Sequence, residues 1–244
     1  MDKELKRQIK EDEFKSAVEH TLEWSRSHSA EVRITAVVAV ILAGVLGAVA
    51  YFQGAQRRDA ERGFAEAVET FAASVKAPGE APGESGRSFA TSLEKYTQAA
   101  AAFDGLARKF PSRPEGLRAR YFAALARVEI GQYVEAEKAL VEIAADRRSS
   151  ALEPALARLA LGDLYRRSGQ TDKAVETFRQ LAADAASALP RDAALMSLAG
   201  TLEDAKKLAE ARASYRRLFE EFPQSVYAAE ARRRADRLAS AVES

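Results

Sequence analysis

The residues of this chain that could do chemistry are few, and their spacing assembles no reactive centre. The 244 residues include no cysteine and two histidines, His20 and His28, so we expect neither a thiol nucleophile nor a histidine-based metal site. The acidic pairs Glu203-Asp204 and Glu220-Glu221 are adjacent in sequence, and adjacent side chains diverge on a helix. No glycine-rich phosphate loop is visible. We therefore expect no catalytic residues, no metal and no cofactor, and predict that the protein is not an enzyme.

The charge pattern gives no case for nucleic acid as a partner. Lys and Arg number 37 and Asp and Glu number 36, which leaves a net charge of +1. The densest basic run, Arg232-Arg233-Arg234, could attract phosphate. Glu230 and Asp236 flank this run, however, and favour a salt-bridged helix surface instead.

The elements that would position any functional residue are predicted to be helices. Hydrophobic residues make up 47% of the chain, and Gly and Pro contribute only 13 and 7 positions. Such a composition lacks the turn residues that a sandwich or barrel needs. The sequence therefore predicts an all-α fold, with a single N-terminal transmembrane helix followed by a solenoid of helix hairpins.

The transmembrane helix is predicted over residues 34–56, which carry no charge. About 20 apolar residues span a bilayer as a helix, and Tyr51 and Phe52 stand where interfacial aromatic residues are common. The rival interpretation is a cleaved signal peptide, with Ala48-Val49-Ala50 as the cleavage site. The preceding 33 residues, with eight acidic side chains, are too long and too acidic for a signal n-region.

Three further features concern the surroundings of this span. Residues 11–26 of the tail form an apolar face at helical spacing, which suits either a surface-binding helix or a plain juxtamembrane helix. Ala39, Ala43 and Gly47 have the small-x-x-x-small spacing of some helix dimers, so a homo-oligomer is possible, although alanine-rich spans produce this pattern by chance. Basic residues near the two ends of the span tie at three each, and the rest of the tail tips the orientation toward a cytoplasmic N-terminus.

Beyond the span, the chain repeats itself at intervals of 37 and 38 residues. Leu161-Gly162, Gly169, Ala174 and Phe178 recur as Leu198-Ala199, Lys206, Ala211 and Tyr215. The same pattern occurs earlier around residues 123–143, and the segments 99–111 and 211–223 match at identical spacing and end in Phe-Pro. The small residues predict close helix crossings, the glycines predict left-handed helix ends, and the prolines follow the last turn of a helix.

This pattern resembles the tetratricopeptide repeat, a pair of antiparallel helices. The resemblance implies a solenoid whose first helices line a concave groove that binds protein segments. Transferred to this chain, the groove positions are Arg118, Tyr121, Leu125, Val128, Leu156, Leu159, Asp163, Arg166, Ala193, Met196, Gly200 and Glu203. The predicted division of the chain is a charged tail over 1–33, the span over 34–56, a degenerate first repeat over 57–111 with a Pro/Gly linker at 77–87, and repeats over 112–244 with a capping helix at 224–242.

The whole layout also resembles the ancillary subunit family of the SecYEG translocon. That resemblance implies a bacterial inner-membrane protein with periplasmic repeats that link the translocon to chaperones. Two alternatives remain open: a cell-envelope assembly or division factor, and a scaffold on the same anchor that faces the cytoplasm.

Overall fold

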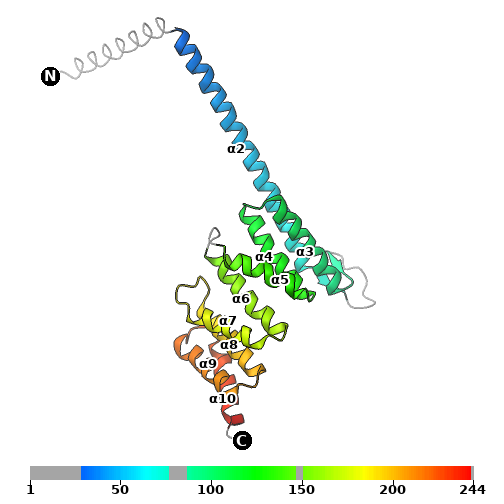
Figure 1. Cartoon of the computed structure of the whole chain (residues 1–244), viewed down its shortest axis with the longest axis vertical. Coiled ribbons are helices and arrows are strands. Elements are labelled where there is room, and N and C mark those ends of the chain that lie inside the picture. The colour runs from blue at the N-terminus through cyan, green and yellow to red at the C-terminus, as the bar shows by residue number, and fades with distance from the viewer. Residues whose placement is uncertain (1–28, 77–86, 147–150, 243–244) are drawn as a thin grey trace, which may run out of the picture. The chain divides into compact units, whose positions relative to one another are not determined.

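The computed structural model describes residues 29–76, 87–146 and 151–242. The tail helix expected over 11–26, both histidines and most of the 77–87 linker lie outside these residues. The chain divides into two compact units, Met1–Arg58 and Asp59–Ser244. The regular elements of the described residues are helices, apart from two short strands, which confirms the predicted all-α class (Figure 1). The elements are α2 (Ser29–Ala72), β1 (Ser74–Val75), β2 (Ser88–Phe89), α3 (Ser92–Lys109), α4 (Pro114–Glu129), α5 (Tyr133–Ala144), α6 (Leu152–Arg167), α7 (Thr171–Ala183), α8 (Arg191–Asp204), α9 (Leu208–Glu221) and α10 (Ala228–Val242).

The apolar segment of the first unit forms part of α2, where its side chains are exposed on every side. Val40, Leu46 and Phe52 are 72%, 68% and 65% exposed. Within the described residues, α2 is the one helix whose length and composition would allow it to cross a membrane. Left in water, each such side chain forgoes about 1.5–3 kcal/mol of burial free energy. Within the described part of the first unit, these side chains find no apolar cover.

The N-terminal hairpin of the second unit, which precedes the three repeat hairpins described below, pairs residues 59–72 of α2 with α3 around an aromatic cluster. Phe64 and Phe71 contact Phe103 from α3 and Phe122 from α4, and the rings of Phe103 and Phe122 stack 5.3 Å apart. Gly63 lies against Leu106, since a Cβ at that glycine would stand 2.7 Å from the leucine Cδ1. The degenerate first repeat is thus a packed hairpin.

The first helix of this N-terminal hairpin ends at Ala72, so residues 73–76 separate it from the linker predicted at 77–87. Ser74–Val75 pairs in parallel with Ser88–Phe89, and the Lys76 amide donates to the Phe89 carbonyl at 3.0 Å. The Arg87 guanidinium also reaches the buried Thr70 hydroxyl. These contacts join the two flanks of the Pro/Gly linker, and residue spacing alone could not reveal them.

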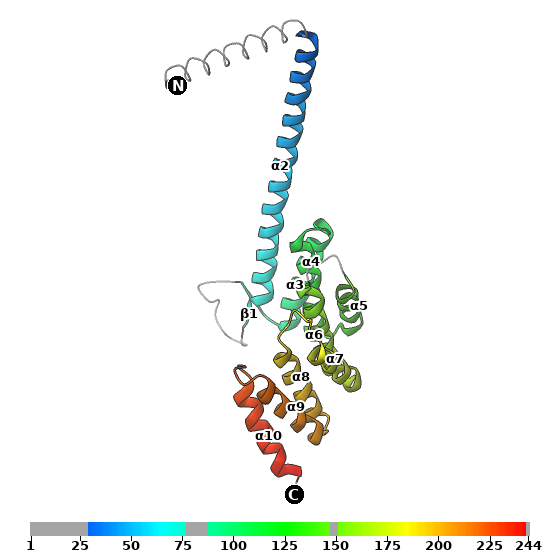
Figure 2. The same cartoon turned by 90° about the vertical axis from the view of Figure 1, so that its left-hand side faces the viewer.

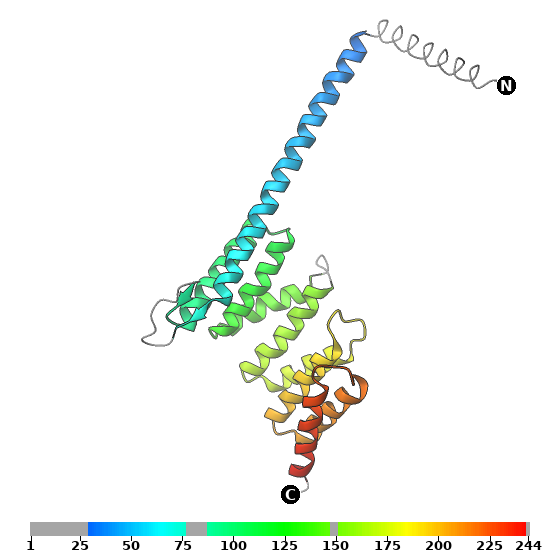
Figure 3. The same cartoon turned by 180° about the vertical axis from the view of Figure 1, so that it is seen from behind.

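The remaining helices form three hairpins, α4–α5, α6–α7 and α8–α9, followed by α10. Each helix packs on the next, so the hairpins stack in sequence order (Figures 1 and 2). Seen from behind, α10 lies along α9 at the C-terminal end of the stack (Figure 3). Residues 184–190 connect α7 to α8.

In the three hairpins α4–α5, α6–α7 and α8–α9, the first helix ends in the same left-handed turn. Gly131, Gly169 and Lys206 have φ values of 76°, 77° and 61°. In each case the amide of the following residue donates to a carbonyl five residues earlier, at 2.9, 2.8 and 2.9 Å in chain order. This bond is characteristic of the Schellman motif. The two glycine predictions are confirmed, and Lys206 adopts the same conformation despite its Cβ.

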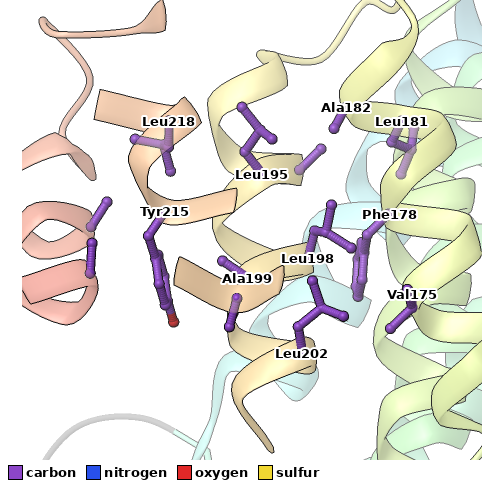
Figure 4. Packing of buried hydrophobic residues seen from close by; sticks show 14 of the residues in the cluster. Val175, Phe178, Leu181, Ala182, Leu195, Leu198, Ala199, Leu202, Tyr215 and Leu218 are labelled. Atoms are coloured by element: carbon purple, nitrogen blue, oxygen red, sulfur yellow. The ribbon is translucent and has the colours of Figure 1, made fainter. Parts of the chain in front are cut away.

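The predicted close crossing at Gly162 is also confirmed. A Cβ at this position would stand 2.4 Å from Cε1 of Phe178, a residue that is fully buried. Figure 4 shows Phe178 between α7 and α8, against Leu198 and Leu202. The ring therefore fills space both within its own hairpin and toward the next.

The ends of the stack differ slightly from the sequence-based expectation. Pro111 and Pro223 follow α3 and α9 as predicted, but the last helix begins at Ala228 instead of residue 224. A turn precedes it, because the Ser225 amide donates to the Phe222 carbonyl at 3.0 Å. The Arg233 and Arg234 guanidinium groups both pair with Glu230, as expected for a salt-bridged surface.

Candidate partner-binding groove

A cleft of about 280 Å³ lies between α4 and α6, the first helices of two successive hairpins. Leu125, Val128 and Leu159 form its apolar side, and Asp163 forms part of its polar side. The full lining is Tyr121, Leu125, Val128, Glu129, Leu159, Ala160, Asp163, Arg166 and Arg167. These residues recur every three or four positions, so one face of each helix supplies the cleft.

A second cleft, of about 220 Å³, continues from the first between α6 and α8. Its lining is Asp163, Arg166, Ser197, Gly200, Thr201, Asp204 and Arg234. Asp163 and Arg166 line both clefts, so the two form one continuous groove across α4, α6 and α8. The first half of this groove is apolar, and the second half is polar.

Ion pairs organise the polar groups of the groove. Arg167 on α6 pairs with Glu129 on α4 at 2.9 Å. Arg166 lies 3.6 Å from Asp163 and 4.0 Å from Asp204. Because charge-assisted hydrogen bonds are usually about 2.7–2.9 Å long, the two contacts of Arg166 are loose.

Burial raises the pKa of two groups in the groove. Desolvation raises the pKa of the Asp163 carboxyl above its ordinary value, although Arg166 and Arg167 act in the opposite direction. Desolvation also raises the pKa of the Tyr121 hydroxyl, and the neighbouring Asp163 charge adds to that effect. The carboxylate of Asp163 is therefore less well stabilised than one in water.

Eight of the twelve sequence-predicted groove residues line the clefts or an adjoining pit. The first cleft brings together Tyr121, Leu125, Val128, Leu159, Asp163 and Arg166, and the second contains Gly200. Ala193 meets Leu159 at a small apolar pit of about 30 Å³. Their role in partner binding remains a prediction, but the structure places them on one surface.

The other four predicted residues lie apart from these linings. Arg118 is exposed on α4 and Leu156 is half-buried on α6, each near the start of its helix. Met196 packs against the core of α7, α8 and α9. Glu203 accepts a hydrogen bond from the Tyr215 hydroxyl at 2.8 Å and pairs with Arg234. Glu203 thus joins α8 to α9 and α10.

Sequence reasoning missed several residues that line the groove: Glu129, Ala160, Arg167, Ser197, Thr201, Asp204 and Arg234. Most of them are next to a predicted residue, so a wider helical stripe would have included them. Asp204 appeared in the sequence only as one half of an acidic pair. Arg234 belongs to α10, and only the tertiary structure brings it to α8.

A larger hollow of about 580 Å³ lies away from the groove, near the loops that join the hairpins. Its lining is mainly alanine, with an ion pair of 3.4 Å between Arg158 and Asp184. It offers no large apolar side chain to anchor a partner. Among the described residues, no group of three or more His, Cys, Asp or Glu side chains could hold a metal ion.

Comparisons with known proteins agree with this architecture. The sequence profile of the family described as "Tetratricopeptide repeat" matches residues 90–152 and 159–226. Crystallised TPR-like repeats of a Podosopora anserina protein described as a kinesin light chain are 18% identical, with a TM-score of 0.51 over 62% of this chain and 80% of that one. A single-substitution variant of those repeats is also 18% identical, with a TM-score of 0.47 over 62% and 86%. No curated protein sequence matches the chain.

Proposed function

The chain belongs to the tetratricopeptide-repeat family, and we propose that it is a membrane-anchored adaptor whose groove across α4, α6 and α8 captures a segment of a protein partner. Repeats of this family imply a role in protein–protein interaction and are typically scaffolds without catalytic activity. We propose the membrane anchor, the side of the membrane on which the repeats lie and the nature of the partner.

The exposed apolar surface of α2 carries the membrane proposal. Its large side chains find no cover within the first unit, and the uncharged run of 23 residues is long enough to span a bilayer. A bilayer removes those side chains from water on all sides at once, which a groove on one partner protein would not do. We therefore propose that residues 34–56 remain in the mature protein as its anchor.

The groove carries the adaptor proposal, because it combines an apolar cleft with polar groups in fixed positions. Large, partly exposed side chains such as Tyr121 and Leu159 can lose their remaining contact with water to a partner. A few such side chains usually supply most of the binding energy at an interface. By analogy with the translocon ancillary family, we propose that the partners are translocation or chaperone proteins at the bacterial inner membrane.

Thiol labelling tests the orientation, since a chain without cysteine gives a clean background. We propose that the tail is cytoplasmic and the repeats are periplasmic. Single substitutions Ser16→Cys in the tail and Val226→Cys, whose side chain is 87% exposed, provide the two reporters. In intact cells, an impermeant thiol reagent should label only Val226→Cys. Labelling of Ser16→Cys alone would favour the scaffold that faces the cytoplasm.

Crosslinking in membranes tests the groove. The triple change Tyr121→Ala, Leu125→Ala and Leu159→Ala should reduce the set of crosslinked partners, and it should lower the melting temperature less than the core substitution Gly162→Leu does. The matched control is Val134→Ala, Val141→Ala and Leu93→Ala, three exposed apolar side chains away from the groove lining. If the first variant keeps its full set of partners and its melting temperature, the partner-binding site must lie on another surface.

A further inference from the structure

The point where the two clefts meet holds more carboxylate than guanidinium. Arg166 stands between Asp163 and Asp204, with N–O distances of 3.6 and 4.0 Å. With Arg167 and Glu129, which line the same cleft, two guanidinium groups face three carboxylates at the centre of the groove. Both distances from Arg166 exceed the usual length of a charge-assisted hydrogen bond, and a carboxylate has more acceptor positions than one such contact occupies.

The other cations of the groove lining do not offset this excess. Arg167 is engaged by Glu129 at 2.9 Å. Arg234 donates to Glu230 at 2.8 Å and to the Tyr215 hydroxyl at 3.1 Å, and it also lies 3.4 Å from Glu203. The charge of Arg234 is therefore balanced by Glu203 and Glu230, whereas Arg167 is shared between Glu129 and Asp163.

The burial of Asp163 makes an additional cation favourable there. Desolvation is the largest influence on the carboxyl and raises its pKa, while the two neighbouring arginines compensate only in part. A positive group placed beside this carboxylate would stabilise its charged form. The adjoining cleft presents Leu125, Val128 and Leu159. An apolar surface thus lies directly beside an unbalanced negative charge.

We propose that the groove selects a peptide segment in which an apolar side chain is next to a lysine or arginine. The apolar side chain enters the cleft between α4 and α6, and the cation lies between Asp163 and Asp204. This inference rests on the proposed adaptor function and names the chemistry of its partner. A partner segment with a terminal or side-chain carboxylate at that point would meet like charge, which disfavours it.

A displayed library of random peptides, selected against the full-length chain in phosphatidylcholine nanodiscs, tests this preference. The zwitterionic lipid is essential, because anionic lipid would itself retain basic peptides. Counter-selection on empty nanodiscs removes lipid binders. The enriched peptides should contain Lys or Arg beside Leu, Ile or Phe. Their binding should weaken severalfold when salt rises from about 0.05 to about 0.5 M, because the site is open to solvent.

Substitutions assign the preference to the two aspartates. Asp163→Asn combined with Asp204→Asn should weaken the selected basic peptides about tenfold or more, the scale of a lost charged hydrogen bond. The matched control Glu220→Gln, on α9 and outside the groove lining, should leave the affinity unchanged. Asp204→Lys should reverse the preference toward acidic peptides. Because the Asp204 side chain is 71% exposed, this variant keeps the test independent of folding.

Two negative outcomes have different meanings. If peptides without basic residues are enriched, and their binding needs Leu125 and Leu159 but neither aspartate, the charge preference is overturned and the adaptor proposal stands. If the enriched peptides bind independently of both the apolar and the acidic residues, the groove is not the binding surface and both proposals fail.

Discussion

The second and third hairpins fulfil the same packing rule with different residues. In the second, Gly162 admits the Phe178 ring to a position where a Cβ would stand 2.4 Å from Cε1. In the third, Ala199 and Tyr215 occupy the equivalent positions, and both are fully buried. The third hairpin therefore accommodates an extra methyl group and an extra hydroxyl at these two positions.

The hydroxyl of Tyr215 explains how the third hairpin differs. It donates to Glu203 at 2.8 Å and accepts from Arg234 at 3.1 Å. The ring of Tyr215 also lies below the Arg234 guanidinium, 5.9 Å from its centre. The last hairpin therefore adds a polar network to the apolar contacts that hold α10, whereas the second hairpin contacts α8 through the apolar surface of Phe178.

The largest effect on stability is expected from a bulky side chain at Gly162. Gly162→Leu should lower the free energy of unfolding by about 3 kcal/mol or more, because the Phe178 ring must move in a closely packed core. Denaturant unfolding of the full chain in detergent would measure it. The matched control is Gly105→Leu on α3, where nothing lies within 4 Å of the added Cβ. Equal losses in both variants would contradict a specific close approach at Gly162.

An intermediate effect on stability is expected when the Tyr215 hydroxyl of the third hairpin is removed. Tyr215→Phe should cost about 1–2 kcal/mol, because Glu203 loses a donor in a partly buried site. Thermal unfolding beside the wild-type chain would show the loss. The control is Tyr227→Phe, whose side chain lies at the exposed turn before α10. If the two substitutions have the same effect, the polar network does not hold α10.

A smaller effect on stability, and one of opposite sign, is expected from a substitution at Lys206, where α8 ends. Lys206 has φ of 61°, where the first two hairpins have glycine. Lys206→Gly should stabilise the chain by about 1 kcal/mol, since a left-handed conformation strains residues that have a Cβ. Gly169→Ala should destabilise it by a similar amount. A stabilising Gly169→Ala would show that this turn tolerates a Cβ without strain.

The smallest effect at neutral pH concerns tyrosine ionisation. Burial, followed by the hydrogen bond to Glu203, raises the pKa of Tyr215 to about 12, whereas the unfolded value is about 10. Below pH about 10 the hydroxyl is neutral in both states, so its contribution to stability is complete. Between pH about 10 and about 12 the unfolded chain ionises first, so stability should fall as pH rises. Melting curves should show a weaker fall for Tyr215→Phe. Identical pH dependence in both chains would contradict the shifted pKa.

Much of the fold was readable from local spacing. The apolar run of α2, the left-handed turns at Gly131 and Gly169 and the crossing at Gly162 each leave a mark within a few residues of sequence. These features follow from backbone geometry and helix periodicity, which act over short stretches of chain. The same periodicity placed eight of the twelve groove residues on or beside the clefts.

Other features depend on residues that are distant in sequence, and only the tertiary structure decided them. α2 ends at Ala72 because Ser74–Val75 pairs with a strand beyond the linker. Asp204 faces the groove beside Arg166, whereas Glu203, the preceding residue, is held by Tyr215 and Arg234. Neighbours on a helix point about 100° apart, so which of the two acids meets a partner depends on the helices packed around them. The sequence determined the repeat, and the packing of α8 on α7 and α9, together with its ion pairs to α6 and α10, decided which charges the groove presents.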